Sequence, residues 1–212
     1  MTRVWWRPRS VDWWAAVGFA AGSVCFAAGA IASQWASAPR PAIGVTFFAG
    51  SLMFTSAAYL QLRQAAKRVD RVAALVQLAG TIFFNLSCFA GMKHGLDVRQ
   101  SNLRVWTPDA IGSVCFLVAS EIAFAAVCGR WICLKGRSRE WQVAALNMLG
   151  SIAFGVAAVT SLIEPSTSEP VSAAVANAGT AAGALCFLAG ALLLVPAPAS
   201  PVWEDDARAA AN

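Results

Sequence analysis

The sequence predicts an all-α fold, a polytopic bundle of six transmembrane helices arranged as three repeated hairpins. Three observations carry this prediction: six long apolar runs, a low charged fraction, and one short motif that recurs once in every run. Runs of roughly 20 residues cross a hydrocarbon core about 30 Å thick at 1.5 Å per residue. Because lipid offers the backbone no hydrogen-bond partners, each run is expected to fold as a helix.

The composition leaves little room for a soluble domain. Of the 212 residues, 58% are hydrophobic and 13% are charged, and the mean hydropathy is +0.59, whereas a soluble domain carries about a quarter charged residues. The net charge of +5 does not indicate nucleic-acid binding, because the basic residues lie in short connectors and no nucleic-acid motif accompanies them. We therefore expect the lipid bilayer as the main partner; homo-oligomerisation and any small solute stay unspecified.

The recurring motif, here called the Gly–Phe motif, is glycine, a small residue, an aliphatic residue, a variable residue and phenylalanine. Its copies are Gly22–Phe26, Gly50–Phe54, Gly80–Phe84, Gly112–Phe116, Gly150–Phe154 and Gly183–Phe187. The first and last positions share one helix face. Helices in lipid associate where small residues let backbones approach, and beyond Ser, Thr and Cys the motif carries no polar group. We therefore expect these glycines and phenylalanines to form helix–helix contacts.

The first half of the chain is predicted to hold a short cytoplasmic segment, residues 1–10, and the start of a six-helix domain that covers residues 11–195. The first three helices are expected over residues 11–35, 42–62 and 72–92. The first run imitates a secretory signal, but its apolar core is longer than that of a signal, so we expect it to be retained. Pro39 and Pro41 make the turn that follows.

The second half follows a polar connector, residues 93–106. Thr107 as a cap, Pro108 at the first helical position and Asp109 near the positive end of the helix dipole predict the start of the fourth helix. The last three helices are expected over residues 107–132, 141–163 and 171–195. Several prolines forbid further helix after that, so residues 196–212 are expected to form a disordered cytoplasmic tail.

The distribution of basic residues predicts the orientation. Twelve of the 16 lysines and arginines lie in the N-terminal segment, the second and fourth connectors and the tail. The positive-inside rule therefore places both termini in the cytoplasm and the protein in the cell membrane. The helices can be read as three hairpins around an axis along the membrane normal or as two inverted sets of three. We favour hairpins, because Gly112 and Gly183 begin motifs of the same Cys-Phe form in even-numbered helices.

Residues 76–120 resemble the YrhK-like domain of small bacterial membrane proteins. The resemblance rests on the motifs that begin at Gly80 and Gly112 and on Trp106 just before the second of these helices. The outer hairpins look like degenerate copies of the same unit. The resemblance implies an architecture and no mechanism, since the family has no assigned activity.

Glu121 is the strongest polar candidate, because both of its flanks are apolar. An acid near a helix centre costs about 2.5–3.5 kcal/mol on insertion scales, so it usually faces a bundle interior or water. Such a carboxyl would suit a proton relay; pairing with Arg130 or the headgroups is the structural alternative. Asn85, Asn147 and Gln77 are expected to hydrogen-bond between helices, at about 0.6 kcal/mol on average. The alternative is that Asn85 and Asn147 join Glu121 in a transport site.

The motifs of enzymes, metal sites and cofactor sites are missing from the sequence. It contains no nucleophile elbow, HExxH pattern, phosphate loop or dinucleotide fingerprint. The six cysteines lack the spacing of a metal site or a disulfide framework; Cys128 and Cys133 are candidates for palmitoylation or a redox role. We therefore predict a non-enzymatic structural or accessory membrane protein without a cofactor, with a small transporter or ion or proton channel as the alternative.

Overall fold

The structure, a computed structural model, describes residues 8–35, 39–131, 133 and 138–195. Within these ranges the secondary structure is helical, apart from one isolated bridge between Ile163 and Pro170. The elements are α1 (Val11–Trp35), α2 (Arg40–Gln64), α3 (Arg68–Gly91), α4 (Val98–Ser101), the π-helix η1 (Asn102–Trp106), α5 (Thr107–Cys128), α6 (Arg139–Thr160) and α7 (Ala173–Leu194). The prediction of an all-helical chain with six long apolar helices is confirmed, and six spans have the length and composition to cross a membrane.

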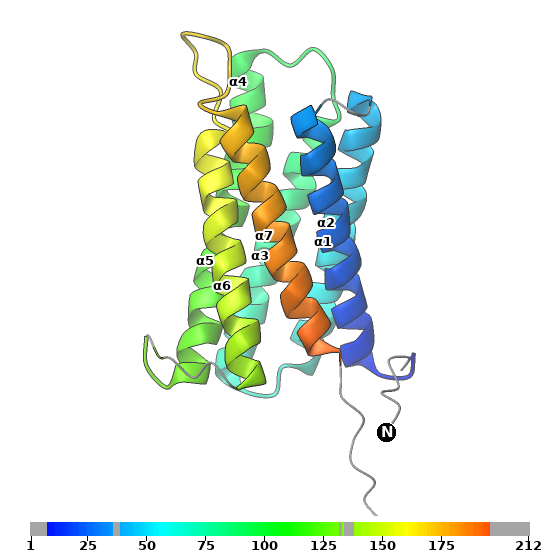
Figure 1. Ribbon diagram of the computed structural model, residues 1–212, viewed down its shortest axis with the longest axis vertical. Coiled ribbons are helices and arrows are strands. Elements are labelled where there is room, and N and C mark those ends of the chain that lie inside the picture. The colour runs from blue at the N-terminus through cyan, green and yellow to red at the C-terminus, as the bar shows by residue number, and fades with distance from the viewer. Residues whose placement is uncertain (1–7, 36–38, 132, 134–137, 196–212) are drawn as a thin grey trace, which may run out of the picture.

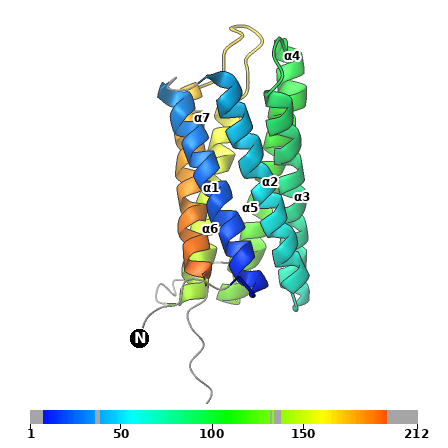
Figure 2. The ribbon, with the colours of Figure 1, turned by 90° about the vertical axis from the view of Figure 1, so that its right-hand side faces the viewer.

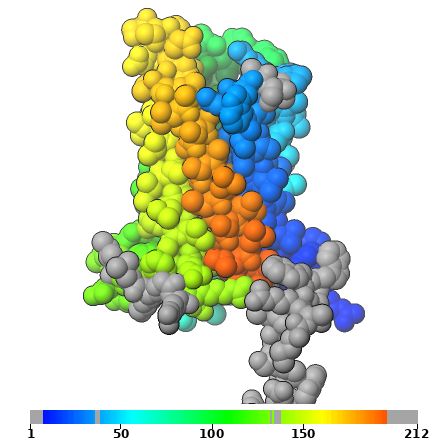
Figure 3. All heavy atoms as spheres, in the orientation of Figure 1, coloured from blue at the N-terminus to red at the C-terminus, as the bar shows by residue number. Residues whose placement is uncertain are grey.

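The long helices stand side by side and form a closed ring (Figures 1 and 2). Around the ring the order is α1, α2, α3, α5, α6, α7 and back to α1, and Figure 3 shows α7 between α6 and α1 on one face. The beginning of α1 and the end of α7 lie at one end of the bundle, which we call the terminal end (bottom of Figure 1). The opposite, distal end carries α4 and the loop between α6 and α7.

The fourth span begins earlier than the sequence predicts. Helical structure runs without a break over Val98–Cys128, 31 residues, so the prediction of a connector up to residue 106 is wrong in its second half. Asp97 caps this helix, because its carboxylate accepts a hydrogen bond from the Gln100 N–H at 2.7 Å. The polar residues in this stretch hid the start of the helix.

The π-helix η1 is one wider turn within this span, and its residues hydrogen-bond to the neighbouring elements. The Ser87 hydroxyl of α3 donates to the Val105 carbonyl at 2.9 Å. The Asn102 amide bonds Ile163 of the distal loop in both directions, at 2.7 Å and 3.1 Å. The Thr107 hydroxyl donates back to the Asn102 carbonyl at 2.9 Å, so Thr107 lies inside a continuous helix and is not its cap.

The ends of the other helices follow their caps. Gly129 has φ +68°, a left-handed conformation that favours glycine, and it ends α5 before the predicted residue 132. Ser138 and Ser172 cap α6 and α7 by accepting hydrogen bonds from backbone N–H groups. The predicted tail, residues 196–212, and most of the predicted N-terminal segment lie outside the described residues.

The Gly–Phe motifs meet at mid-depth in three antiparallel pairs, α1 with α2, α3 with α5 and α6 with α7. A Cβ atom on Gly22 would lie 2.6 Å from Cδ2 of Phe54 and 2.9 Å from the Gly50 carbonyl oxygen. In return, a Cβ atom on Gly50 would lie 3.0 Å from Cδ2 of Phe26. The other two pairs repeat this reciprocal contact. Each glycine is therefore needed for the approach of the facing backbone and for the ring that covers it.

The six motif phenylalanines converge on the bundle axis and form one cluster, here called the phenylalanine layer. On the distal side Phe26, Phe84 and Phe154 form a triangle with centroid distances of 6.0–6.4 Å. On the terminal side Phe54, Phe116 and Phe187 form a second triangle with distances of 5.6–6.2 Å. The rings are 1–8% exposed, so the centre of the bundle is filled with packed aromatic side chains.

The remaining motif positions have fixed directions too. The small second residue is buried in all six copies: Ser23, Ser51, Thr81, Ser113, Ser151 and Ala184. The aliphatic third residue is exposed on the outside in all six: Val24, Leu52, Ile82, Val114, Ile152 and Leu185. The motif therefore encodes the rotation of each helix about its own axis.

Candidate functional site

An axial cavity of about 660 Å³ lies between the phenylalanine layer and the terminal end of the bundle. All six long helices contribute to its wall. Its volume is in the range of sites that hold small molecules, about 300–1,000 Å³. Eleven of the 19 described lining residues are apolar, and eight are polar or charged.

The deep part of the cavity is lined by amides. Gln77 of α3 and Asn147 of α6 each lie three residues before the glycine of their motif, and Phe19 takes this place in α1. Gln61, an exposed residue in the last turn of α2, adds a third amide near the terminal end of the wall. An amide both donates and accepts hydrogen bonds, so these side chains can bind a polar solute without carrying charge.

The mouth of the cavity carries charges of both signs. Asp70 and Glu140, in the first turns of α3 and α6, face Lys67 and Arg139 in the same lining. The Arg139 guanidinium donates a hydrogen bond to the Val195 carbonyl at 2.7 Å, which ties the start of α6 to the end of α7. The lining at the mouth therefore carries two acidic and two basic side chains.

The closed end of the cavity is the phenylalanine layer itself. Phe187 of α7 lies in the lining, and its ring contacts the rings of Phe54, Phe116 and Phe154 at centroid distances of 5.4–6.0 Å. The cavity is therefore a vestibule that ends at mid-depth in this conformation.

The structure separates the three polar residues that the sequence proposes for transport. Asn147 lines the cavity. Asn85 lies on the distal side of its motif, where its amide N–H donates to the Thr55 hydroxyl of α2 at 2.8 Å. Glu121 is partly buried on α5 but does not belong to the described lining of the cavity. Of the three residues, only Asn147 belongs to the described lining of the cavity.

Asp109 is a polar residue whose position the sequence analysis missed. Because the fourth span begins at Val98, Asp109 is far from the start of the helix and does not serve its dipole. It shares a helix face with Ser113 and Phe116, which are 4% and 1% exposed. Its carboxyl lies within electrostatic reach of the Cys88 thiol of α3, which packs against the phenylalanine layer. Its position three residues before Gly112 places Asp109 on the helix face of the motif glycine, so the sequence contains the signal for this orientation.

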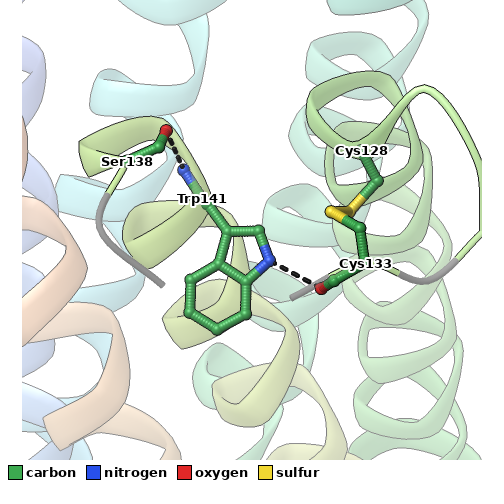
Figure 4. Close-up of a disulfide and its surroundings, with 4 residues drawn as sticks. All are labelled: Cys128, Cys133, Ser138 and Trp141. Carbon is green, nitrogen blue, oxygen red and sulfur yellow. Dashed lines mark hydrogen bonds between the residues drawn. A yellow bond between two sulfur atoms is a disulfide. The ribbon is translucent and has the colours of Figure 1, made fainter. Parts of the chain in front are cut away.

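A disulfide between Cys128 and Cys133 closes the turn after α5 (Figure 4). The two Cα atoms are 5.4 Å apart, and both residues are buried. The spacing of the cysteines does not predict a disulfide framework, and the structure corrects this at one pair. Four other cysteines, Cys25, Cys88, Cys115 and Cys186, are free thiols.

Comparison with protein-family models, curated proteins and solved structures gave no match. The resemblance of residues 76–120 to the YrhK-like domain therefore stays a prediction.

Proposed function

We propose that this chain is a non-catalytic integral membrane protein that binds a small uncharged or zwitterionic solute in its axial cavity. The single observation that carries the proposal is the cavity of about 660 Å³ that all six helices line. Its deep polar groups are amides, which do not transfer protons at neutral pH. The balanced charges at its mouth favour neither a strong anion nor a strong cation.

The architecture that supports this function is a threefold repeat of a helical hairpin. Asp12, Asp70 and Glu140 each lie ten residues before the motif glycine of α1, α3 and α6. The near-equal sides of both phenylalanine triangles agree with the same threefold axis. Two inverted sets of three would instead relate odd-numbered spans to even-numbered ones, and these acids lie in odd-numbered spans only.

The proposed orientation places the cavity mouth in the cytoplasm. Seven of the 11 described lysines and arginines lie at the terminal end, and positively charged connectors stay on the cytoplasmic side. The exposed aliphatic positions of the motif then face lipid. The solute would enter from the cytoplasm, and the phenylalanine layer would stop it from crossing.

Ligand-induced stabilisation tests the proposal. The protein in lipid nanodiscs is melted in the presence of zwitterionic amino acids, neutral polyols, dicarboxylates and polyamines in separate samples. A bound solute raises the melting temperature, because it binds only the folded state. We expect a rise with a member of the first two classes and its loss in Asn147→Leu and Gln77→Leu. Asn177→Leu, which removes a partly buried amide that donates to Gln34 at the distal end, is the matched control and keeps the rise.

A second candidate, proton-coupled transport, is favoured by Asp109 on the other side of the phenylalanine layer. An ionisable residue inside a membrane bundle is a functional candidate by default. Asp109 and the axial cavity lie on opposite sides of the phenylalanine layer, so a proton path between them would have to pass these packed rings. Proton flux into liposomes that is lost in Asp109→Asn and kept in Glu121→Gln would support transport; equal flux in both variants and in empty liposomes would exclude it.

A further inference from the structure

We propose that Cys128 and Cys133 form a thiol–disulfide exchange site that controls the mouth of the axial cavity. This inference names a regulation of the proposed binding site and rests on that proposal. The site consists of the last residue of α5, the described Cys133 in the following loop, and the Trp141 side chain that links this loop to α6 (Figure 4).

The tryptophan connects the cystine to the first turn of α6. Its indole N–H donates to the Cys133 carbonyl at 2.9 Å, and its backbone N–H donates to the Ser138 hydroxyl at 3.3 Å. Its ring also lies 6.2 Å from the ring of Phe124 on α5. The disulfide holds Cys133 against the end of α5, so the indole, Cys133 and both helix ends form one closed unit.

This unit is part of the cavity wall. Ala126 and Val127 directly precede Cys128 and line the cavity from α5. Ser138, Arg139 and Glu140 line it from α6, immediately before Trp141. Breaking the disulfide leaves Cys133, which the Trp141 indole still contacts, without its covalent cross-link to the end of α5. The wall between α5 and α6 is expected to loosen at the mouth.

The chemistry needs a small disulfide such as oxidised glutathione as the oxidant. One cysteine thiolate attacks a sulfur of the oxidant and releases its first thiol; the second thiolate attacks the mixed disulfide and releases the other. One S–S bond forms in the protein, one is broken in the oxidant, and the two cysteine protons pass to the released thiols. Because the cytoplasm keeps thiols reduced, the proposed orientation makes the dithiol the resting form and the structure the oxidised form.

Two measurements on the full-length protein in nanodiscs test the exchange and its effect. Samples are equilibrated with reduced and oxidised glutathione over a wide range of ratios, and peptide mass spectrometry counts alkylated thiols. We expect Cys128 and Cys133 to become alkylated together as the ratio of reduced to oxidised glutathione rises. Cys25 and Cys186 should not respond as a pair. A pair that stays bonded at every ratio, or free at every ratio, overturns the exchange site.

Amide hydrogen exchange then reports the cavity wall. Reduction should raise exchange several-fold in the last turn of α5 and the first two turns of α6. Cys128→Ser/Cys133→Ser should show the raised exchange without reductant and no further response, and Cys25→Ser should respond like the unsubstituted chain. Unchanged exchange on reduction overturns control of the mouth.

The two proposals fail separately. If a solute from the panel above binds, its affinity should differ several-fold between the oxidised and reduced protein; equal affinities overturn the regulation alone. If no solute binds while thiol counts and hydrogen exchange respond as expected, the binding function fails and the exchange site stands.

Discussion

The middle of the bundle and its two flanks differ in how closely the three hairpins agree. At mid-depth every hairpin contributes the same reciprocal contact of two glycines and two phenylalanines. On the distal flank one hairpin has Asp109 where the others have Phe47 and Thr180, three residues before the motif glycine. On the terminal flank two hairpins have Gln77 and Asn147 where the first has Phe19.

This difference suggests a division of tasks along the bundle axis. Close packing at mid-depth tolerates few residue types, because small changes of volume in a packed core are felt as clashes or voids. The terminal flank encloses the axial cavity and both flanks carry polar groups, so substitutions there can differ between hairpins without opening the ring. We expect stability to depend on the middle, and the proposed solute binding to depend on the terminal flank.

The largest effect is expected from Phe116→Ala, since Phe116 is 1% exposed and contacts four other rings of the layer. Truncating a buried phenylalanine costs about 3–5 kcal/mol of unfolding free energy. Reversible unfolding in mixed detergent micelles measures it. Phe89→Ala, at a side chain that is 51% exposed, is the control and should change little. Equal effects at both positions would mean that the layer contributes no more than the outer surface.

A smaller effect is expected from Gly22→Ala. The new methyl group would lie 2.6 Å from the Phe54 ring and 2.9 Å from the Gly50 carbonyl, and overpacking of this kind costs about 1–3 kcal/mol. Gly155→Ala on α6 has no atom within 4 Å and should be neutral or stabilise by up to about 1 kcal/mol. The same unfolding assay distinguishes them. If Gly22→Ala leaves the unfolding free energy unchanged, the packing at mid-depth is no tighter than that of the flanks.

The smallest effect is expected from a polar contact outside the layer. Thr55→Val removes the acceptor of the Asn85 amide between α2 and α3, and such contacts contribute about 0.6 kcal/mol on average in membranes. Asn85→Leu removes the whole side-chain amide. The hydrogen bond from its N–H is lost, but so is its carbonyl oxygen, which is buried without a partner. The two effects oppose each other, so the unfolding free energy should change little. A loss as large as that of Phe116→Ala would show that polar contacts rival the layer.

The repeated motif made the mid-depth part of the fold predictable, because one short pattern recurs and each of its positions has a single direction. The fourth span was harder to predict. Thr107 and Pro108 imitate a helix start, and the true cap at Asp97 precedes a polar stretch that resembles a connector. That error also displaced Asp109 from the interior to a helix end.

The candidate site was less predictable than the fold. A cavity belongs to six helices together, and no single run shows which of its residues will face it. Gln77 and Asn147 could have been recognised by their equal distance from the motif glycine, whereas Gln61 has no such partner. The pairing of Cys128 and Cys133 depends on the turn at Gly129, which spacing alone does not specify.

A double-mutant cycle between Gly112→Ala and Phe84→Leu tests the reciprocal glycine–phenylalanine contact most directly. A Cβ atom on Gly112 would lie 2.9 Å from two carbons of the Phe84 ring, so the smaller leucine should relieve the clash. We predict a coupling energy of about 1 kcal/mol or more, and additivity within about 0.5 kcal/mol for Gly112→Ala with Phe124→Leu, which lies twelve residues further along α5, about 18 Å away. Additivity in both pairs, or equal coupling in both, would contradict the account.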